Sequence, residues 1–342
     1  MSAATALGAA VLAAVMAVGG APAGAETAPA PEPAPQPALA GGEAVGTGAF
    51  LTYSDKETVI EGGTVVPPDA AAPSAEAGVD LTGRGRAVAA LGYSPYVEGA
   101  GLVNAFGGTD LPLGRLSDPA RATVSGHPTQ QAEAPVPGDR PAGRARAAIV
   151  DGPRAEAEAQ AAGRDAAPPG VTVRIGQATA TVDRGSGAGE ASVTVVLRGV
   201  RVGDDLAFDA VRLTARAVAD GAAGLASASS TVEGATFGGR PVRLTPRGLE
   251  PLVPGPAIPE AGSGVEVVAP GSEWATPGGR EAGASATGPR LRLSTPDGRV
   301  LDVVLGRASA SSTHVPAGDQ GPGPGAAVAG TEPRRAALVA RP

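Results

Sequence analysis

Hydrophobic and polar residues alternate with a period of two through much of the second half of the chain. The segment that begins at Val171 reads VTVRIGQA and places Val171, Val173 and Ile175 on one face. This alternation, with many β-branched residues, is typical of half-buried strands. The same pattern predicts strands over 191–202, 206–218 and 299–305.

Residues typical of turns separate these segments. Asp, Gly and Ser cluster between them at Asp183–Gly189, Gly203–Asp205, Asp220–Gly221 and Asp297–Gly298. Strands joined by short turns, without helical patterns between them, favour an antiparallel arrangement. The predicted fold is mainly β, an antiparallel sandwich or curled sheet of Ala/Val/Thr-rich strands, with disordered Pro/Gly-rich termini.

A loose repeat of alternating small and polar residues supports this prediction. Alanine on one face and Ser, Thr or Glu on the other makes thin strands. Such strands fit either tight packing of two sheets or a curled sheet with room inside, and the sequence leaves both open. The repeat occurs at 155–161, 178–181, 226–231, 284–287 and 308–312.

Composition changes along the chain and suggests its domain organisation. The 342 residues include 52 Gly and 34 Pro, and Val, Leu, Ile and Phe are denser between 171 and 310 than between 26 and 170. A packed core is therefore expected mainly in the second half, as one domain with a wrapped N-terminal part or as two domains. The predicted parts are a signal peptide (1–25), a Pro-rich disordered spacer (26–42), an N-terminal segment packing on the core (43–143), a β-rich core (144–315) and a disordered tail (316–342).

The first residues predict export. An uncharged apolar stretch of about 16 residues, from Ala3 to Val18, is followed by Ala23-Gly24-Ala25, an A-x-A cleavage pattern before Glu26. The length suits a signal peptide better than a membrane span. No Lys or Arg precedes the stretch, so either the terminal amine serves alone or the true start lies upstream.

One region resembles a known class of proteins. In order, it combines VTVRIGQATATVD, ASVTVVLRGVRV, DAVRLTARA and SSTVEGATFGGRPV, between residues 171 and 254. This is similar to the repetitive β-rich regions of exported proteins of high-GC actinobacteria, some grouped as "choice-of-anchor" proteins. The resemblance implies an envelope location and β structure, and it brings no catalytic residues with it.

Composition excludes several kinds of chemistry. The chain has no Cys, so disulfides and thiolate metal sites are impossible, and it has two histidines, His127 and His314. A net charge of −7 and eight aromatic residues argue against nucleic-acid binding. No nucleophile elbow or phosphate-binding glycine loop occurs, and no spacing singles out a Ser–His–Asp set. We predict no catalytic residues and no cofactor.

Three groups of polar or aromatic residues could still form sites. Asp204, Asp205 and Asp209 surround a turn and could bind Ca²⁺ weakly, but they lack the calcium-loop pattern, so we predict a solvated turn and no metal site. Glu156 and Glu158 should share a strand face as solvated carboxylates. Trp274, in a Gly/Pro-rich loop, is the obvious exposed platform for a sugar ring.

The most distinctive non-repetitive stretch begins at Tyr93-Ser-Pro-Tyr96 and continues to Phe106. It could present a partner surface, since aromatics are scarce elsewhere. The interpretation we favour is that it caps an Ala-rich sheet that lacks bulk of its own.

Two functional classes remain. The leading hypothesis is a non-catalytic exported structural or interaction protein of the cell envelope, outside the cell or associated with the wall, with wall components as partners. The alternative is a carrier of a lipid or other apolar ligand within a curled sheet. A secreted hydrolase is a weaker third hypothesis.

Export gives the first testable prediction. The mature protein, recovered from culture supernatant or wall extract, should begin at Glu26 in N-terminal sequencing, because cleavage follows Ala25. Recovery of the chain from the cytoplasm with Met1 intact would contradict the localisation.

Overall fold

A computed structural model of the chain shows strands and turns throughout its described part, and every strand pairing is antiparallel. The described residues are 38–52, 72–93, 120–126, 130–134, 143–150, 154–163, 171–185, 187–245, 248–254, 265–266, 271–294 and 300–317.

The strands form two sheets, which we call A and B. Sheet A has the order β15-β18-β19-β1-β2-β3-β4, with β17 also paired to β19 and β16 to β17. Its strands are β1 (Leu39–Thr52), β2 (Ala72–Val79), β3 (Gly85–Tyr93), β4 (Ala120–Gly126), β15 (Val265–Glu266), β16 (Ser272–Ala275), β17 (Glu281–Thr287), β18 (Arg290–Ser294) and β19 (Val300–Val315).

Sheet B follows the order β14-β13-β12-β10-β9-β8-β7-β6-β5, and β11 pairs with β10. Its strands are β5 (Gln130–Ala134), β6 (Arg144–Val150), β7 (Arg154–Gly163), β8 (Val171–Arg184), β9 (Gly189–Val202), β10 (Leu206–Ala219), β11 (Gly224–Glu233), β12 (Thr236–Phe237), β13 (Arg240–Thr245) and β14 (Gly248–Pro251). Strands β7 to β11 are joined in chain order as a meander.

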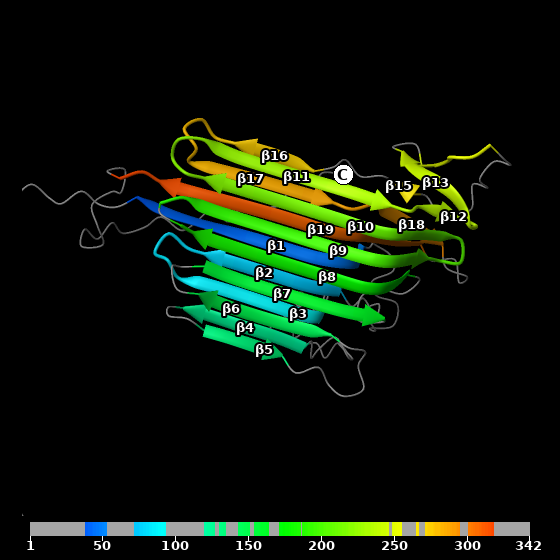
Figure 1. Ribbon diagram of the computed structural model, residues 1–342, viewed down its shortest axis with the longest axis horizontal. Helices are drawn as coiled ribbons and strands as arrows, with labels where there is room; N and C mark the ends of the chain where they lie inside the picture. Colours follow the sequence, from blue (N-terminus) through cyan, green and yellow to red (C-terminus); the bar gives the residue numbers. More distant parts are fainter. Residues whose placement is uncertain are drawn as a thin grey trace, which may run out of the picture. The chain divides into compact units, whose positions relative to one another are not determined.

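The two sheets pack face to face. In Figure 1 the green strands of sheet B lie over the blue, cyan and orange strands of sheet A. Strand β1 packs on β8 and β9, β2 on β7 and β8, β3 on β6 and β7, and β19 on β9 and β10. The chain is therefore an antiparallel β-sandwich, and the predicted fold class is confirmed.

Small residues line much of the interface between the sheets. Alanines of both sheets are almost fully buried there, and at several positions glycine brings the sheets closer still. A Cβ added at Gly46 of β1 would lie 2.7 Å from Val193 Cγ2 and 3.1 Å from Val195 Cγ2 on the opposite sheet. The inner faces are therefore in direct contact in this region, and the thin strands serve tight packing.

The regular alternation breaks once along each long strand of sheet B. In β9, Val195 and Leu197 point inward, and so do Val200 and Val202 beyond Gly199. The inward set changes from odd to even numbers across Gly199, whose φ of 60° is one that glycine adopts freely. Strands β8 and β10 change at the same level, and the pairing register is the same on both sides of the break. Each strand thus accommodates one extra residue there, as a bulge does.

Sheet A carries a matching break. In β19, Val303 and Leu305 point into the core before Gly306, and Ala308 and Ala310 after it. Gly306 has a φ of 95°, and a Cβ there would approach Leu213 Cδ1 of sheet B to 2.8 Å. Larger core residues, including Leu197, Leu213 and Leu305, gather near the level of Gly306. The core therefore contains large aliphatic side chains here and mostly alanines elsewhere.

The sequence-based strands agree well with the second half of the structure. The segments predicted at 191–202 and 206–218 are β9 and β10. The segment predicted at 308–312, and that at 299–305 from Val300 on, lie in the single long strand β19. The range predicted as an N-terminal segment, 43–143, supplies β2 to β4 and most of β1 to sheet A, and β1 begins at Leu39, inside the predicted spacer. The predicted signal peptide and the residues of the tail from 318 onward lie outside the described part of the chain.

One edge of sheet B is closed by a side chain from sheet A. Among the described strands β11 pairs only with β10, so its other side is an edge of the described sheet. There the backbone N–H of Ala228 donates to Glu273 Oε1 of β16 at 2.6 Å. The carboxylate occupies a donor that a further strand would otherwise use.

The contact at Gly46 gives a prediction about stability. Gly46→Ala should lower the free energy of unfolding by about 1–3 kcal/mol, because a methyl group must displace the stiff Val193 side chain. Urea unfolding measures the loss. Gly78→Ala is the matched control, because the nearest atom to a Cβ there is 3.7 Å away; its effect should stay within about 1 kcal/mol.

Val193→Ala provides a second check on the same contact. It should cost stability alone, but the double variant with Gly46→Ala should be more stable than the sum of the two single losses. Strict additivity would show that the two positions do not touch.

Candidate functional site

Of the two histidines, the structure describes only His314; His127 lies outside the described residues. His314 sits near the end of β19 with 7% of its surface exposed, so it is a core residue. Its ring lies directly against Gly221, in the turn after β10. Its Nδ1 is buried and has no hydrogen-bond partner among the described atoms.

A serine and an aspartate lie close to His314. Ser312 points to the same side of β19 and is 2% exposed, and its hydroxyl donates to Gly189 O at 2.7 Å and to Gly41 O at 3.3 Å. The serine hydroxyl is thus engaged with backbone carbonyls of both sheets. No hydrogen bond joins Ser312 to His314 in the described structure, and the serine instead links the two sheets through these carbonyl groups.

Asp220 organises the turn that covers His314. Its Oδ1 accepts hydrogen bonds from the N–H groups of Ala223 at 2.7 Å and Ala222 at 2.8 Å. These bonds, first that of Ala223, hold the pKa of the Asp220 carboxyl below its ordinary value of 3.8, and a smaller electrostatic contribution from the nearby His314 acts in the same direction. The aspartate therefore serves as an ionised cap of the turn.

The other carboxylates weighed from the sequence do not converge. Asp204 and Asp205 are exposed in the turn between β9 and β10, and the Asp209 carboxylate lies against Gly234. Within the described ranges no three His, Asp or Glu residues are grouped as a metal site. Glu156 and Glu158 lie on the outer face of β7, as their spacing predicts.

Each of these two glutamates has a polar partner. Arg154 Nε lies 2.6 Å from Glu156 Oε1, and Gln177 Nε2 donates to Glu158 Oε1 at 3.4 Å. The Glu156 contact therefore runs along β7 itself, and the Glu158 contact crosses to β8, both on a solvated surface.

Trp274 is exposed, but it lies in strand β16 and not in a loop. Its indole covers Gly283 of β17, its cross-strand partner: a Cβ at Gly283 would lie 2.5 Å from Trp274 Cε2. One ring face is thus committed to the sheet. The distinctive stretch after Tyr93, up to Phe106, lies outside the described residues.

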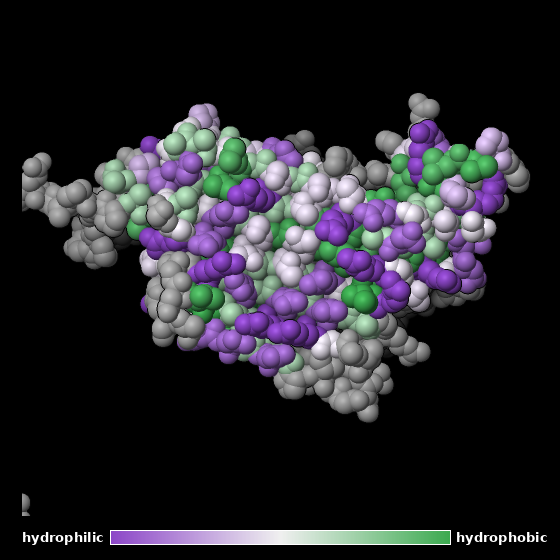
Figure 2. Space-filling view, in the orientation of Figure 1, coloured by the Kyte–Doolittle hydropathy of each residue, from purple (hydrophilic) through white to green (hydrophobic). Residues whose placement is uncertain are grey.

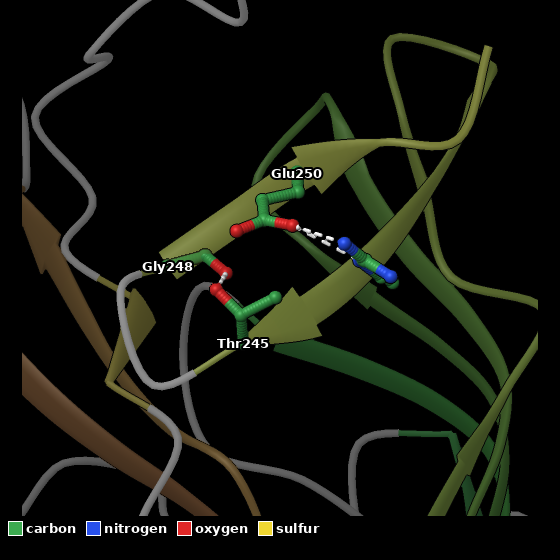
Figure 3. A network of polar contacts seen from close by, with 4 residues as sticks. Thr245, Gly248 and Glu250 are labelled. Atoms are coloured by element: carbon green, nitrogen blue, oxygen red, sulfur yellow. Dashed lines mark hydrogen bonds and ion pairs between the residues drawn. The ribbon is translucent and has the colours of Figure 1, made fainter.

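A polar network holds the hairpin of β13 and β14 (Figure 3). Arg243 donates from Nε at 3.0 Å and from Nη2 at 2.7 Å to Glu250 Oε2, and Thr245 Oγ1 donates to Gly248 O at 3.0 Å. These contacts satisfy one another across the hairpin, and the ion pair is exposed. The network therefore stabilises the turn modestly and leaves little capacity for a ligand.

A shallow hollow on the outer face of sheet A has an apolar floor formed by Val45, Phe50 and Val88. The Arg307 guanidinium lies above the Phe50 ring, 5.5 Å from its centroid. Of the two arginines that line this hollow, Arg121 and Arg307, the second is therefore already engaged with a protein ring.

The outer face of sheet B carries a row of hydroxyl groups. Thr179, Thr194, Thr214 and Ser229 are direct cross-strand partners on β8, β9, β10 and β11, and we call them the hydroxyl row. Thr214 Oγ1 and Ser229 Oγ lie 2.7 Å apart, and Thr179 Oγ1 donates to Thr194 O at 3.4 Å. Aligned hydroxyls on neighbouring strands present a regular set of donors and acceptors to the solvent.

Four exposed arginines lie beside this row, at the break in the alternation. They are Arg174, Arg198, Arg201 and Arg212, and we call them the arginine patch. Arg198 and Arg201 are three residues apart, so a regular strand would place them on opposite faces. The extra residue at Gly199 turns both side chains outward. The Arg174 side chain lies over Gly199: a Cβ added at Gly199 would be 3.0 Å from Arg174 Cβ.

Other arginines on this face are paired with acidic side chains. Arg216 Nε lies 2.8 Å from Glu190 Oε1, Arg144 Nε 3.5 Å from Glu133 Oε1, and Arg154 bridges Glu156 and Asp183. The guanidinium groups of the arginine patch have no such partner among the described residues. Figure 2 shows strongly hydrophilic residues spread over this face, around a paler area in its middle.

Comparison of the chain with family models, with curated proteins and with solved structures finds no match in any of the three. The resemblance to repetitive exported proteins therefore stays a prediction. In the described part of the chain, no helix is long and apolar enough to span a membrane.

The Asp220 cap gives a prediction about pH. Because its pKa is lower in the folded chain, its charge stabilises the fold above the ordinary carboxyl pKa, and this contribution disappears as pH falls through the folded pKa. Asp220→Asn should therefore be less stable than the natural chain at pH 7, and the difference should shrink when urea unfolding is measured near pH 3.

Asp204→Asn is the control, since no hydrogen bond of its carboxylate occurs in the described structure. Its stability relative to the natural chain should change much less between the two pH values. A difference for Asp220→Asn that is constant with pH would contradict a charge-dependent cap.

Proposed function

We propose that this chain is a non-catalytic, exported structural or interaction protein of the cell envelope, which acts through the outer faces of its sandwich. The observation that carries the proposal is the division of roles between the faces. The inner faces of the two sheets pack against each other, while the outer face of sheet B carries the hydroxyl row and the arginine patch side by side.

The physical character of the outer face supports contact with an extended partner. A sheet of long strands repeats its surface groups every two residues along each strand and at every neighbouring strand. Single exposed polar contacts are weak, but several contacts made at once by a repeated surface add up to useful avidity. A polymer or a wall surface offers such repetition, whereas a small substrate does not.

Export is proposed from the N-terminal sequence. The apolar stretch Ala3–Val18 and the Ala-Gly-Ala pattern before Glu26 support secretion, and the resemblance of the region 171–254 supports an envelope location. The mature chain would then be held outside the cell by contacts of its surface.

The interior contacts weigh against the alternative of a carrier with its ligand between the sheets. A lipid chain in that place would have to separate Gly46 from Val193, and Gly306 from Leu213, where the backbone of one sheet touches side chains of the other. The interior would lose the packing that supports the fold.

Two measurements on protein purified from its own host separate these functions. The proposed role predicts that the protein pellets with washed cell walls, and that native mass spectrometry after gentle purification gives the mass of the chain alone. A stoichiometric lipid in the organic extract, matched by an equal mass increment in the native spectrum, would overturn the structural role in favour of the carrier.

A further inference from the structure

We propose that the arginine patch, together with the hydroxyl row, binds an acidic polysaccharide, a glycan chain whose sugars carry carboxylates. This inference rests on the proposed role as an envelope interaction protein and specifies its partner. Four arginines lie together, none of them has an acidic partner among the described residues, and hydroxyl groups lie beside them.

The four arginines form one cluster because of the pairing register. Arg198 is the cross-strand partner of Ala210, so Arg212 is its diagonal neighbour on β10. Thr172 is the partner of Arg201, so Arg174 is the diagonal neighbour of Arg201 on β8. Diagonal neighbours on one face lie about 7–8 Å apart, within reach of long side chains. The cluster therefore spans three adjacent strands.

Two acidic residues of the described chain adjoin the cluster, and Asp209 lies at the level of Gly199. Asp209 and Glu233 are the acidic residues next to it on the β10 and β11 side, and the Asp209 carboxylate lies against Gly234, away from β9. The patch thus remains a local positive area on a chain whose net charge is −7. A polyanion would be attracted to this area, and repelled by much of the remaining surface, which would favour one binding position.

The side chains identify the class of partner. A guanidinium group offers a planar fork of donors that matches a carboxylate, and it stays charged at any physiological pH. The hydroxyl row adds neutral donors and acceptors suited to sugar hydroxyls. Neither the patch nor the row contains an aromatic side chain, so stacking on nucleic-acid bases, which strengthens binding to single strands, is not available. Charge and hydroxyl chemistry together favour an acidic glycan over a neutral glycan or a nucleic acid.

Binding of the purified full chain to polygalacturonate tests the proposal. We expect saturable binding that weakens as salt is raised from 50 to about 300 mM, since exposed charges are screened within about 10 Å near 0.1 M salt. Dextran, a neutral glycan, should not bind. The triple variant Arg174→Gln, Arg198→Gln, Arg201→Gln should weaken polygalacturonate binding by roughly tenfold or more, because charge-assisted contacts are lost.

The chain offers a matched control on the same face. The triple variant Arg144→Gln, Arg154→Gln, Arg216→Gln removes the same charge from arginines that already have acidic partners, and it should change the affinity by less than about threefold. Unfolding curves of both variants verify that each is folded.

Three outcomes would overturn the proposal. Equal losses in the two triple variants would mean that net charge alone drives binding. Tighter binding to single-stranded DNA or to inorganic polyphosphate than to polygalacturonate would mean that the patch selects phosphate. Absence of binding to polygalacturonate, with wall pelleting retained, would remove the acidic glycan as partner and leave the envelope role standing.

Discussion

Close contact between two faces of small side chains is the interaction on which the rest of this structure depends. An alanine buries little apolar area, so each residue contributes less than a leucine or phenylalanine would. The sandwich compensates with length and alignment, because strands of 14 to 16 residues repeat the small contact many times. Positions such as Gly46 show how little tolerance remains, since a single methyl group would overlap the opposite sheet.

The break in alternation links the core to the surface. Without it, a strand has a fixed inner and a fixed outer set of residues along its whole length. With it, the inner set changes at Gly199 and Gly306, which lets the larger residues Leu213 and Leu305 enter the core near that level. The same displacement changes the outer set, and it is the reason that arginines with odd spacing share a face. Surface chemistry here is a consequence of backbone geometry inside the sheets.

The period-two pattern was sufficient to predict β8, β9, β10 and the first part of β19, because their branched residues alternate clearly. It did not predict β16, where Trp274 was expected in a loop. It did not reveal β1, whose sequence LAGGEAVGTGAFLT contains four glycines and resembles a loop. The strand accommodates these glycines because other groups fill the space that side chains would need: Val193 of the opposite sheet at Gly46, and residues of the neighbouring strand β2 at Gly41 and Gly48. His314 was expected at the end of a strand, but its burial depends on the turn at Asp220–Gly221, which is distant in sequence.

The arginine patch could not be predicted for two physical reasons. Strict alternation separates Arg198 from Arg201, and only the positive φ of Gly199 reunites them. The large number of arginines relative to the single lysine, Lys56, also reads as compositional bias, so no individual arginine stands out in the sequence. The arginines of the patch differ from paired ones, such as Arg216 with Glu190, in having no acidic partner among the described residues, and this difference depends on the fold.

The carboxylate of Glu273 at the edge of β11 has a further consequence for an Ala-rich β-protein. Repeated small residues in long strands favour stacking of one molecule on the next, edge to edge, into fibrils. An added strand would have to displace the Glu273 carboxylate from the Ala228 N–H. Burying this carboxylate without a hydrogen-bond partner would be costly. The sandwich can thus contain long Ala-rich strands while the edge of β11, protected by Glu273, resists the addition of strands from other molecules.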